Sequence, residues 1–342
     1  MSDALRDESE RLRRSWQRHD AAMLRDYLVA DVEDPRLNVQ SLLTRHFLTF
    51  ALTGAFQELA DHELRFALAL NWLLQLHKDN PGPDAPAAVL HALRHDADNA
   101  EGIELPHHLR QTFRGLPALA DGCAVPDYLT PALTAPAAPR DAGWLPAEVL
   151  DTFLGLWRAA LAPVSTPACR VLEPACGSAN DYRFLVASGL ATRLDYTGVD
   201  LSEKNIANAR ALFPHSRFEV GNAFDLAGDA PAYDYAFVHD LFEHLSPDGL
   251  AVALRSVCRA TRRGLCLHFF NMDEIPATVV RPVDEYHWNT VSLDEVLACC
   301  AAEGFTGQAF HIGTFLRQRF GCETTHNPNA YTLLLGRSGP AS

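Results

Sequence analysis

Several sequence patterns that mark a bound metal ion or a dinucleotide are missing from this chain of 342 residues. Its eight cysteines include no C-x-x-C pair and no Cys/His spacing of a zinc site, and the C-x-x-x-C-x-x-C spacing of an iron–sulfur cluster is also absent. The dinucleotide-binding pattern G-x-G-x-x-G does not occur either. We therefore expect neither a zinc centre nor a cluster, and we predict no resident metal ion.

Positive charge and long apolar runs are also scarce. Lysine and arginine number 29 against 43 aspartates and glutamates, and the resulting net charge of −14 argues against a phosphate-binding surface. The longest apolar run of the first half, Phe66–Leu76, is interrupted by Asn71 and is too short to span a bilayer. We expect no nucleic-acid or membrane partner, no signal peptide, and reduced thiols in a cytoplasmic protein.

The length of the chain suits two domains. Residues 1–115 are predicted to form a helical N-terminal domain, in which an apolar helix over Ala55–Leu76 would be the core of a bundle. Proline and alanine dominate residues 116–146, as is typical of a linker. Residues 147–342 are predicted to form the second domain. We expect the N-terminal domain to cover a ligand site or to form a homodimer contact.

The stretch Cys169–Leu185, CRVLEPACGSANDYRFL, organises the second domain. Its apolar residues predict a buried strand that ends on Glu173, and a turn of small residues around Gly177 precedes the start of a helix. Small residues let a ligand lie against the backbone of such a turn, because a larger side chain would push it away. Glu173 would repel a pyrophosphate, whereas it suits a ligand that carries positive charge.

This stretch resembles the first motif of the class I S-adenosylmethionine-dependent methyltransferases, which reads acid-x-small-x-Gly-x-small after a strand. Glu173, Ala175, Gly177 and Ala179 occupy those places, with two alanines where glycine is commoner. The resemblance continues in order to about Arg337 and implies that the cofactor is S-adenosylmethionine (SAM), whose sulfonium and ammonium groups are positively charged. It does not extend to residues 1–165.

The later strand ends supply the rest of the expected cofactor site. Asp200 ends the second strand, where an acid can accept hydrogen bonds from both ribose hydroxyls. The resemblance implies that Asn222 and Ala223 bind adenine, while Phe224 either stacks on adenine or is a core residue. His239 adjoins the cofactor in the family pattern. The predicted cofactor-binding residues are Glu173, Ala175, Gly177, Ala179, Asp200, Leu201, Asn222, Ala223, Phe224 and His239.

Regular alternation of strands and helices predicts the fold of the second domain. It implies a parallel sheet covered by helices, with ligands at the carboxyl ends of the strands. We expect an α/β fold with a Rossmann-like, seven-stranded, mostly parallel sheet and flanking helices, preceded by an all-α N-terminal domain. After the first strand, the predicted strands are Leu194–Val199, Arg217–Val220, Tyr233–Val238, Leu265–Phe270 and an antiparallel pair, Phe305–Ile312 and Tyr331–Leu335.

Methyl transfer to a hydroxyl acceptor needs a group that removes its proton, and a histidine with a near-neutral pKa is suited to this. The candidates are His239, His244 and His287, and His287 is slightly favoured because aromatic residues flank it. His239 would alternatively only position SAM, and His244 would alternatively hold a loop. The other predicted acceptor-site residues are Phe270, Asn271, Tyr286 and Trp288.

We therefore predict an enzyme that transfers a methyl group from SAM to a small-molecule acceptor, at oxygen or nitrogen, in specialised metabolism. One alternative is an RNA or protein methyltransferase, against which stand the acidic charge and the absence of N/D-P-P-Y/F after the fourth strand. Another is a non-catalytic scaffold with the same fold, against which stand the intact Glu173 and Asp200. A divalent-metal site is a further alternative, formed by Asp240, Asn271, Asp273 and Glu274.

Overall fold

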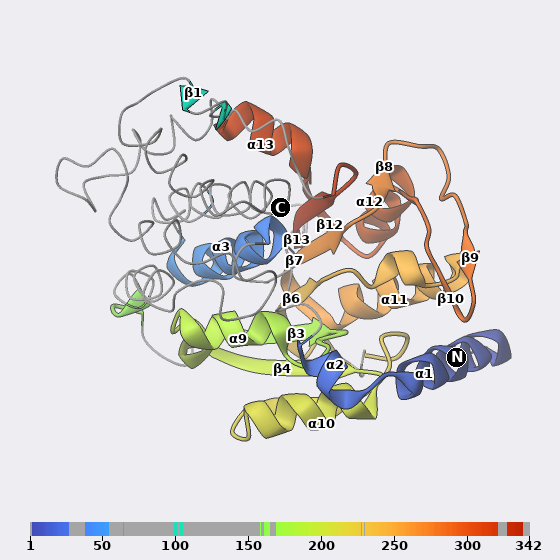
Figure 1. Cartoon of the computed structure of the whole chain (residues 1–342). Helices are drawn as coiled ribbons and strands as arrows, with labels where there is room; N and C mark the ends of the chain where they lie inside the picture. The colour runs from blue at the N-terminus through green and yellow to red at the C-terminus, as the bar shows by residue number, and fades with distance from the viewer. Residues whose placement is uncertain are drawn as a thin grey trace.

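A seven-stranded sheet lies at the centre of the protein, and helices cover it (Figure 1). The computed structural model describes residues 2–26, 38–54, 169–226, 230–320 and 327–337, and in addition residues 64, 99–100, 103–104, 158, 161–164 and 228. The apolar helix predicted over Ala55–Leu76, apart from Leu64, and the predicted linker over 116–146 lie outside the described residues. The domain boundaries therefore remain predictions.

The predicted alternation of strands and helices is present along the second half of the chain. The parallel strands are β3 (Cys169–Pro174), β4 (Leu194–Asp200), β5 (Arg217–Val220), β6 (Tyr233–Val238) and β7 (Thr261–Phe269). Two antiparallel strands complete the sheet, β12 (Phe305–His311) and β13 (Tyr331–Arg337). The helices between these strands are α9 (Asn180–Ala187), α10 (Glu203–Leu212), α11 (Pro247–Ala260) and α12 (Leu293–Ala302). The Rossmann-like sheet predicted from the sequence is confirmed.

The order of the strands shows where a ligand should bind. The sheet runs β12-β13-β7-β6-β3-β4-β5, so β3 lies between β4 on one side and β6 on the other. Strands β4 and β5 therefore extend the sheet on one side of β3, whereas the next strands along the chain, β6 and β7, extend it on the other side. The order of the strands reverses at β3. Ligands of open parallel sheets bind at such a reversal, beyond the carboxyl ends of the strands. This places the candidate site at the ends of β3, β4 and β6.

Two hydrophobic layers, one on each face, hold the sheet. In β7, Leu265 and Leu267 pack into the layer that contains α11 and α12, whereas Cys266 packs into the layer that contains α9 and α10. This follows from the alternation of side chains along a strand. The N-terminal helix α3 (Val39–Thr53) packs against β7 and β13, and its Phe47 joins the same layer as Cys266.

Two further N-terminal helices precede α3. They are α1 (Asp3–Arg18) and α2 (Ala21–Asp26). Asp20 separates them, because its Oδ1 accepts hydrogen bonds from the N–H groups of Ala22 at 2.8 Å and Met23 at 3.2 Å, which starts α2. In Figure 1 these helices lie beside α10 and α11, so this part of the N-terminal region contacts the sheet domain directly.

Some short elements are not evident in the sequence pattern. A helix, α13 (Ile312–Phe320), fills the connection between β12 and β13. The two-residue strands are too short for a periodic signal. Within the described residues they form three pairs: β1 (Asn99–Ala100) with β2 (Ile103–Glu104), β8 (Met272–Asp273) with β11 (Val291–Ser292), and β9 (Pro282–Val283) with β10 (Tyr286–His287).

Gly198 in β4 is packed too closely to carry a side chain. A Cβ atom there would lie 2.7 Å from the Tyr196 hydroxyl, 2.8 Å from the Phe218 ring and 2.9 Å from Cys176 Sγ. We expect Gly198→Ala to lower the free energy of unfolding by about 1–3 kcal/mol, the usual cost of overpacking. Urea unfolding measures this, with Gly336→Ala in β13 as the control because no atom lies within 4 Å of its added Cβ. Equal stability of the two variants would contradict the prediction.

Candidate active site

The turn between β3 and α9 contains residues with left-handed backbone conformation. The φ angle is 58° at Ala175, 53° at Gly177 and 66° at Ala179. Glycine adopts such angles freely, whereas a residue with a Cβ pays roughly 1–2 kcal/mol. Strained backbone of this kind concentrates at ligand sites. The small residues of the first motif thus coincide with the positions where the backbone is unusual.

Asp200, at the end of β4, holds this turn in place. One carboxylate oxygen accepts a hydrogen bond from the Gly177 N–H at 3.0 Å. The other accepts from the Ser202 N–H at 2.7 Å and from the Asn205 amide at 3.2 Å. Burial raises the pKa of Asp200, because its charged form loses hydration. A carboxylate has about four acceptor positions, so three are used within the protein and one is left for a ligand hydroxyl.

Glu173 lies buried at the end of β3, and its carboxylate accepts a hydrogen bond from the Tyr196 hydroxyl. Burial, and after it the negative charge of Asp181, raises the pKa of Glu173 well above its usual range. A cation brought close to Glu173 would oppose both effects, because it stabilises the ionised carboxylate. This environment therefore favours a positively charged ligand over a phosphate.

Asn180, the first residue of α9, adds an acceptor that the sequence motif did not single out. Its Oδ1 atom is buried and has no hydrogen-bond partner among the described residues. Such an unmet acceptor costs about 1–3 kcal/mol, so a donor from a ligand would be stabilising here. Together with Glu173 and Asp200 it forms a group of buried hydrogen-bond acceptors beside the turn.

Asn222, after β5, contacts the N-terminal region. Its Oδ1 accepts a hydrogen bond from the Phe224 N–H at 3.0 Å, and its Nδ2 donates to Ser9 Oγ of α1 at 2.7 Å. Phe224 is buried in the same hydrophobic layer as Leu5 of α1, so it occupies a core position. Of the other residues expected near adenine, Leu201 and Ala223 are half-buried. Helix α1 therefore lies over the residues expected to bind adenine.

Further contacts hold α1 across the carboxyl ends of the strands. The buried Glu8 accepts hydrogen bonds from the N–H and hydroxyl of Ser246, both at 2.6 Å, and Ser246 caps the N-terminus of α11. Lys204 of α10 donates to the carbonyl oxygens of Gln17 at 2.6 Å and His19 at 2.8 Å. These contacts join α1 to the segments that follow β6 and β4.

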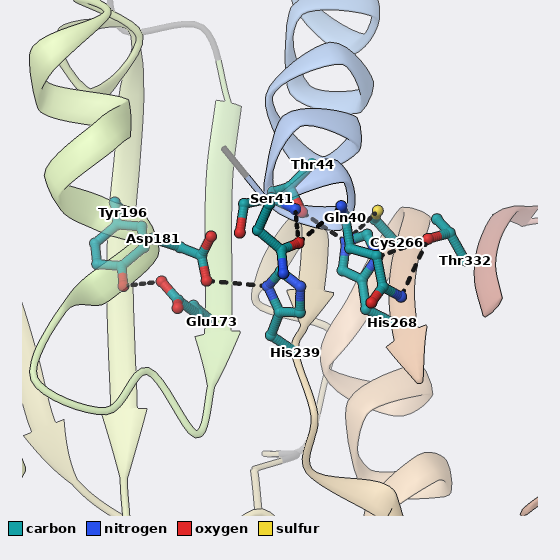
Figure 2. A network of polar contacts seen from close by, with 11 residues as sticks. Gln40, Ser41, Thr44, Glu173, Asp181, Tyr196, His239, Cys266, His268 and Thr332 are labelled. Atoms are coloured by element: carbon teal, nitrogen blue, oxygen red, sulfur yellow. Dashed lines mark hydrogen bonds and ion pairs between the residues drawn. The ribbon is translucent and has the colours of Figure 1, made fainter. Parts of the chain in front are cut away.

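His239, immediately after β6, forms a buried ion pair with Asp181 of α9 (Figure 2). The His239 Nδ1 atom lies 3.0 Å from Asp181 Oδ2, and the two side chains are only 14% and 10% exposed. Burial opposes the charge of the imidazole, but the adjacent Asp181 carboxylate raises the pKa of His239 to about 9. For Asp181 burial alone would raise the pKa, because it disfavours the charged carboxylate. The charge and hydrogen bond of His239 outweigh this effect and bring the pKa of Asp181 below its usual range.

Helix α3 supplies polar side chains to the same network (Figure 2). His268 of β7 stacks on His239 with ring centroids 4.3 Å apart, and its Nε2 lies 2.6 Å from Thr44 Oγ1. The other ring nitrogen lies 2.9 Å from Thr332 Oγ1. Burial and then the charge of His239 hold the pKa of His268 well below its usual range, so this ring is neutral. Gln40 of α3 donates to the carbonyl oxygen of Tyr331 at 2.8 Å.

His244, in the short helix Phe242–His244 after β6, lies in an aromatic cluster that we call the His244 cluster. Its other members are Phe270, Tyr286 and Trp288, whose ring centroids lie 5.3, 5.6 and 5.6 Å from that of His244. Phe270 and Trp288 also contact each other at 4.8 Å. The structure thus brings together His244 and three residues that the sequence predicted for the acceptor site.

Buried polar groups fix the His244 cluster to the end of the sheet. Glu243 accepts hydrogen bonds from the N–H groups of Phe270 at 2.6 Å and Asn271 at 3.3 Å. Burial, and after it the charge of Asp240, raises the pKa of Glu243 to about 8. Asn289 donates from its backbone to the Glu243 carbonyl at 3.0 Å and from its side chain to the Leu245 carbonyl at 2.8 Å.

The remaining predicted residues take different places. His287 contributes its backbone carbonyl to the His244 cluster, and its side-chain Nδ1 is buried without a hydrogen-bond partner among the described residues. Asn271 directs its amide to the Asn289 carbonyl and the Thr290 hydroxyl, at 2.9 and 3.1 Å, which anchors the loop. Among the described residues, His239 contacts Asp181 and His268 instead.

Comparison with known families agrees with this arrangement. Residues 171–264 match the family model described as a methyltransferase domain, and this segment runs from β3 into β7. It contains the strained turn, Asp200 and His244. Residues 171–264 therefore carry a methyltransferase domain. The cofactor of this methyltransferase domain is SAM. No curated protein matches the sequence.

The methyltransferase domain is similar to several solved structures at low identity. A 1,6-didemethyltoxoflavin-N1-methyltransferase from Burkholderia thailandensis is 18% identical, with 55% of this chain and 76% of that chain covered at a TM-score of 0.38. Magnesium protoporphyrin IX methyltransferase from Synechocystis is 17% identical, with 55% and 77% covered and a TM-score of 0.37. The [4+2]-cyclase SpnF is 15% identical, with 62% and 93% covered and a TM-score of 0.39.

Neither a metal-binding group of side chains nor a membrane-spanning helix is found in the part of the chain that the structure describes. Within this part of the chain, no three histidine, cysteine, aspartate or glutamate side chains are grouped so that they could hold a metal ion. Among the same residues, no helix combines the length and the apolar character that crossing a membrane requires.

Proposed function

We propose that the methyltransferase domain transfers a methyl group from SAM to a small-molecule acceptor, at oxygen or nitrogen, in specialised metabolism. The observation that carries this proposal is the position of the His244 cluster. The cluster follows β6, which pairs directly with β3, and β3 leads into the cofactor turn. A cofactor on the turn and an acceptor in the cluster would therefore be neighbours at the same edge of the sheet.

The residues of the turn have definable tasks in this proposal. Glu173 and the Asn180 Oδ1 would accept hydrogen bonds from the ammonium group, Asp200 from a ribose hydroxyl, and Asn222 would face adenine. When bound, SAM supplies a methyl group on a positively charged sulfur that needs no further activation. The protein then has to align the acceptor and to exclude water, and α1 lies where it could exclude water.

The proposed partners follow from charge and from the contacts of α1–α3. A net charge of −14 opposes nucleic acid and an anionic membrane surface, and a cytoplasmic location stays part of the proposal. Helices α1 and α3 contact the methyltransferase domain of their own chain. A homodimer through the N-terminal region stays a prediction.

Calorimetric titration of the purified full chain with S-adenosylhomocysteine (SAH) tests the cofactor part of this proposal. We expect micromolar binding, because the acceptors of the turn suit an ammonium group and ribose hydroxyls. We expect no binding of NADH, because its pyrophosphate lacks the positive charge that would stabilise the ionised form of the buried Glu173. Absence of SAH binding, or tighter binding of NADH, would refute it.

A further inference from the structure

The two ring nitrogens of His244 have different roles. Nδ1 lies 3.1 Å from the carbonyl oxygen of His287. A carbonyl oxygen can only accept a hydrogen bond, so Nδ1 carries the proton. In the neutral ring Nε2 therefore holds a lone pair, and it has no hydrogen-bond partner among the described residues. A fixed tautomer with a free Nε2 is the arrangement that a general base requires.

Burial keeps this ring in its basic form. It lowers the pKa of His244, so the imidazole is neutral at neutral pH and can take a proton. Tyr286 of β10 contacts the ring, and the neighbouring Glu243 directs its carboxylate at the backbone of Phe270 and Asn271. No carboxylate is paired with His244 among the described residues. His239 differs, because its pairing with Asp181 keeps it protonated.

The surroundings of His244 favour a flat aromatic acceptor. Phe270 approaches the His244 ring at a tilt of 35°, whereas Tyr286 and Trp288 meet it edge-on at 79° and 64°. Aromatic rings stabilise another ring by offset stacking or edge contacts. Trp288 is 44% exposed, so a ring that packed on it would gain further burial.

The acidity of the acceptor group decides which acceptors a histidine base can deprotonate. A phenolic hydroxyl has a pKa of about 10, as in tyrosine, which is within reach of an imidazole. An alkyl alcohol is far less acidic, and an alkyl amine is protonated at neutral pH and has no lone pair. We propose that His244 is the catalytic base and that the acceptor is an aromatic hydroxyl compound of the phenol class. This inference rests on the proposed function.

In the proposed reaction the acceptor loses one proton and gains one methyl group. The hydroxyl proton of the phenol passes to His244 Nε2, and the phenolate oxygen forms a bond to the methyl carbon. The bond from that carbon to sulfur breaks, with its electron pair staying on sulfur, so SAM leaves as neutral SAH. The His244 imidazolium then releases its proton to solvent, which restores the base.

The variant His244→Asn separates the base from its structural hydrogen bond. Its amide N–H can still donate to the His287 carbonyl, whereas it cannot take a proton. We expect kcat for methylation of 2-naphthol to fall by about 10²–10⁴, while the Kd for SAH stays within about threefold. The exposed His215→Asn is the matched control. Loss of rate in His287→Asn and retained rate in His244→Asn would overturn the inference.

The pH profile gives a readout that a structural role would not change. The base must be unprotonated, so kcat/KM of the wild-type protein should rise with pH through the pKa of His244, below its ordinary 6.5. This acidic limb should be missing in His244→Asn. An unchanged limb in His244→Asn would show that another group is the base.

Binding of acceptor analogues tests the substrate class without turnover. With SAH bound, phenol and 2-naphthol should quench the fluorescence of Trp288, identified by comparison with Trp288→Phe, whereas cyclohexanol and cyclohexylamine should not. The acceptor class is wrong if SAH binds but the protein prefers cyclohexanol or cyclohexylamine, or binds no phenol. The proposed function stands in that case. If SAH itself fails to bind, the proposed function fails.

Discussion

Asp181→Asn should lower the free energy of unfolding by about 3–5 kcal/mol, because it leaves the His239 imidazolium buried without its counter-charge. A smaller loss is expected for His239→Gln, because the Asp181 carboxylate keeps a hydrogen bond from Ser41 and the nearby positive charge of Arg45. The Asp181→Asn/His239→Gln double variant should lose much less than the sum of the two, since neither charge is then buried. Urea unfolding at neutral pH measures all three.

An exposed ion pair provides the matched control. Arg217 and Glu219 of β5 lie 2.7 Å apart, but their side chains are 62% and 47% exposed. Glu219→Gln should therefore change stability by less than about 1 kcal/mol. A cost for Asp181→Asn as small as that of Glu219→Gln would show that the buried pair does not stabilise the fold.

The same pair should make stability depend on pH. The folded-state pKa of His239, about 9, lies above its ordinary value of 6.5. A group with a raised folded pKa contributes stability fully below its unfolded pKa and loses it as the pH rises through the folded pKa. We expect a loss of about 3 kcal/mol between pH 6.5 and pH 9 relative to the double variant. A constant difference between the two proteins across this range would be inconsistent with a buried imidazolium.

Asp200→Ala should weaken SAH binding by about 2–4 kcal/mol, or roughly 30- to 1,000-fold in Kd. The substitution removes the acceptor for a ribose hydroxyl. It also removes the hydrogen bond that orients the Gly177 N–H in the cofactor turn. Calorimetric titration with SAH measures the effect.

Two companion variants show whether the loss concerns the ligand or the fold. Asp195 lies on the same strand as Asp200, and its side chain is 59% exposed. The Asp195→Ala variant should therefore bind SAH like the wild-type protein. In Asp200→Asn the side chain keeps its shape and one oxygen that can accept a hydrogen bond. Circular dichroism checks that both Asp200 variants are folded. SAH affinity unchanged in a folded Asp200→Ala protein would mean that Asp200 does not contact the cofactor.

The sequence by itself determined the sheet and the cofactor turn. Strand Cys169–Pro174, the small residues around Gly177 and the start of α9 adjoin one another in the chain, so their pattern is legible without knowledge of distant contacts. The acid at the end of β4 is recognised in the same way. Apolar alternation likewise predicted the other main strands, because a buried strand needs apolar side chains wherever it lies. The tasks of these residues toward SAM stay proposals.

Only the tertiary structure decided which polar groups meet. Asp181 contacts His239 because α9 packs beside the end of β6, and Thr44 reaches His268 across 224 positions of sequence. Nothing in the local pattern of α3 indicates such a partner. The histidines differ for the same reason. His239 is charged beside a carboxylate, whereas His244 is neutral among aromatic rings, because burial and neighbouring charge set the protonation of an imidazole and both arise only when distant segments pack.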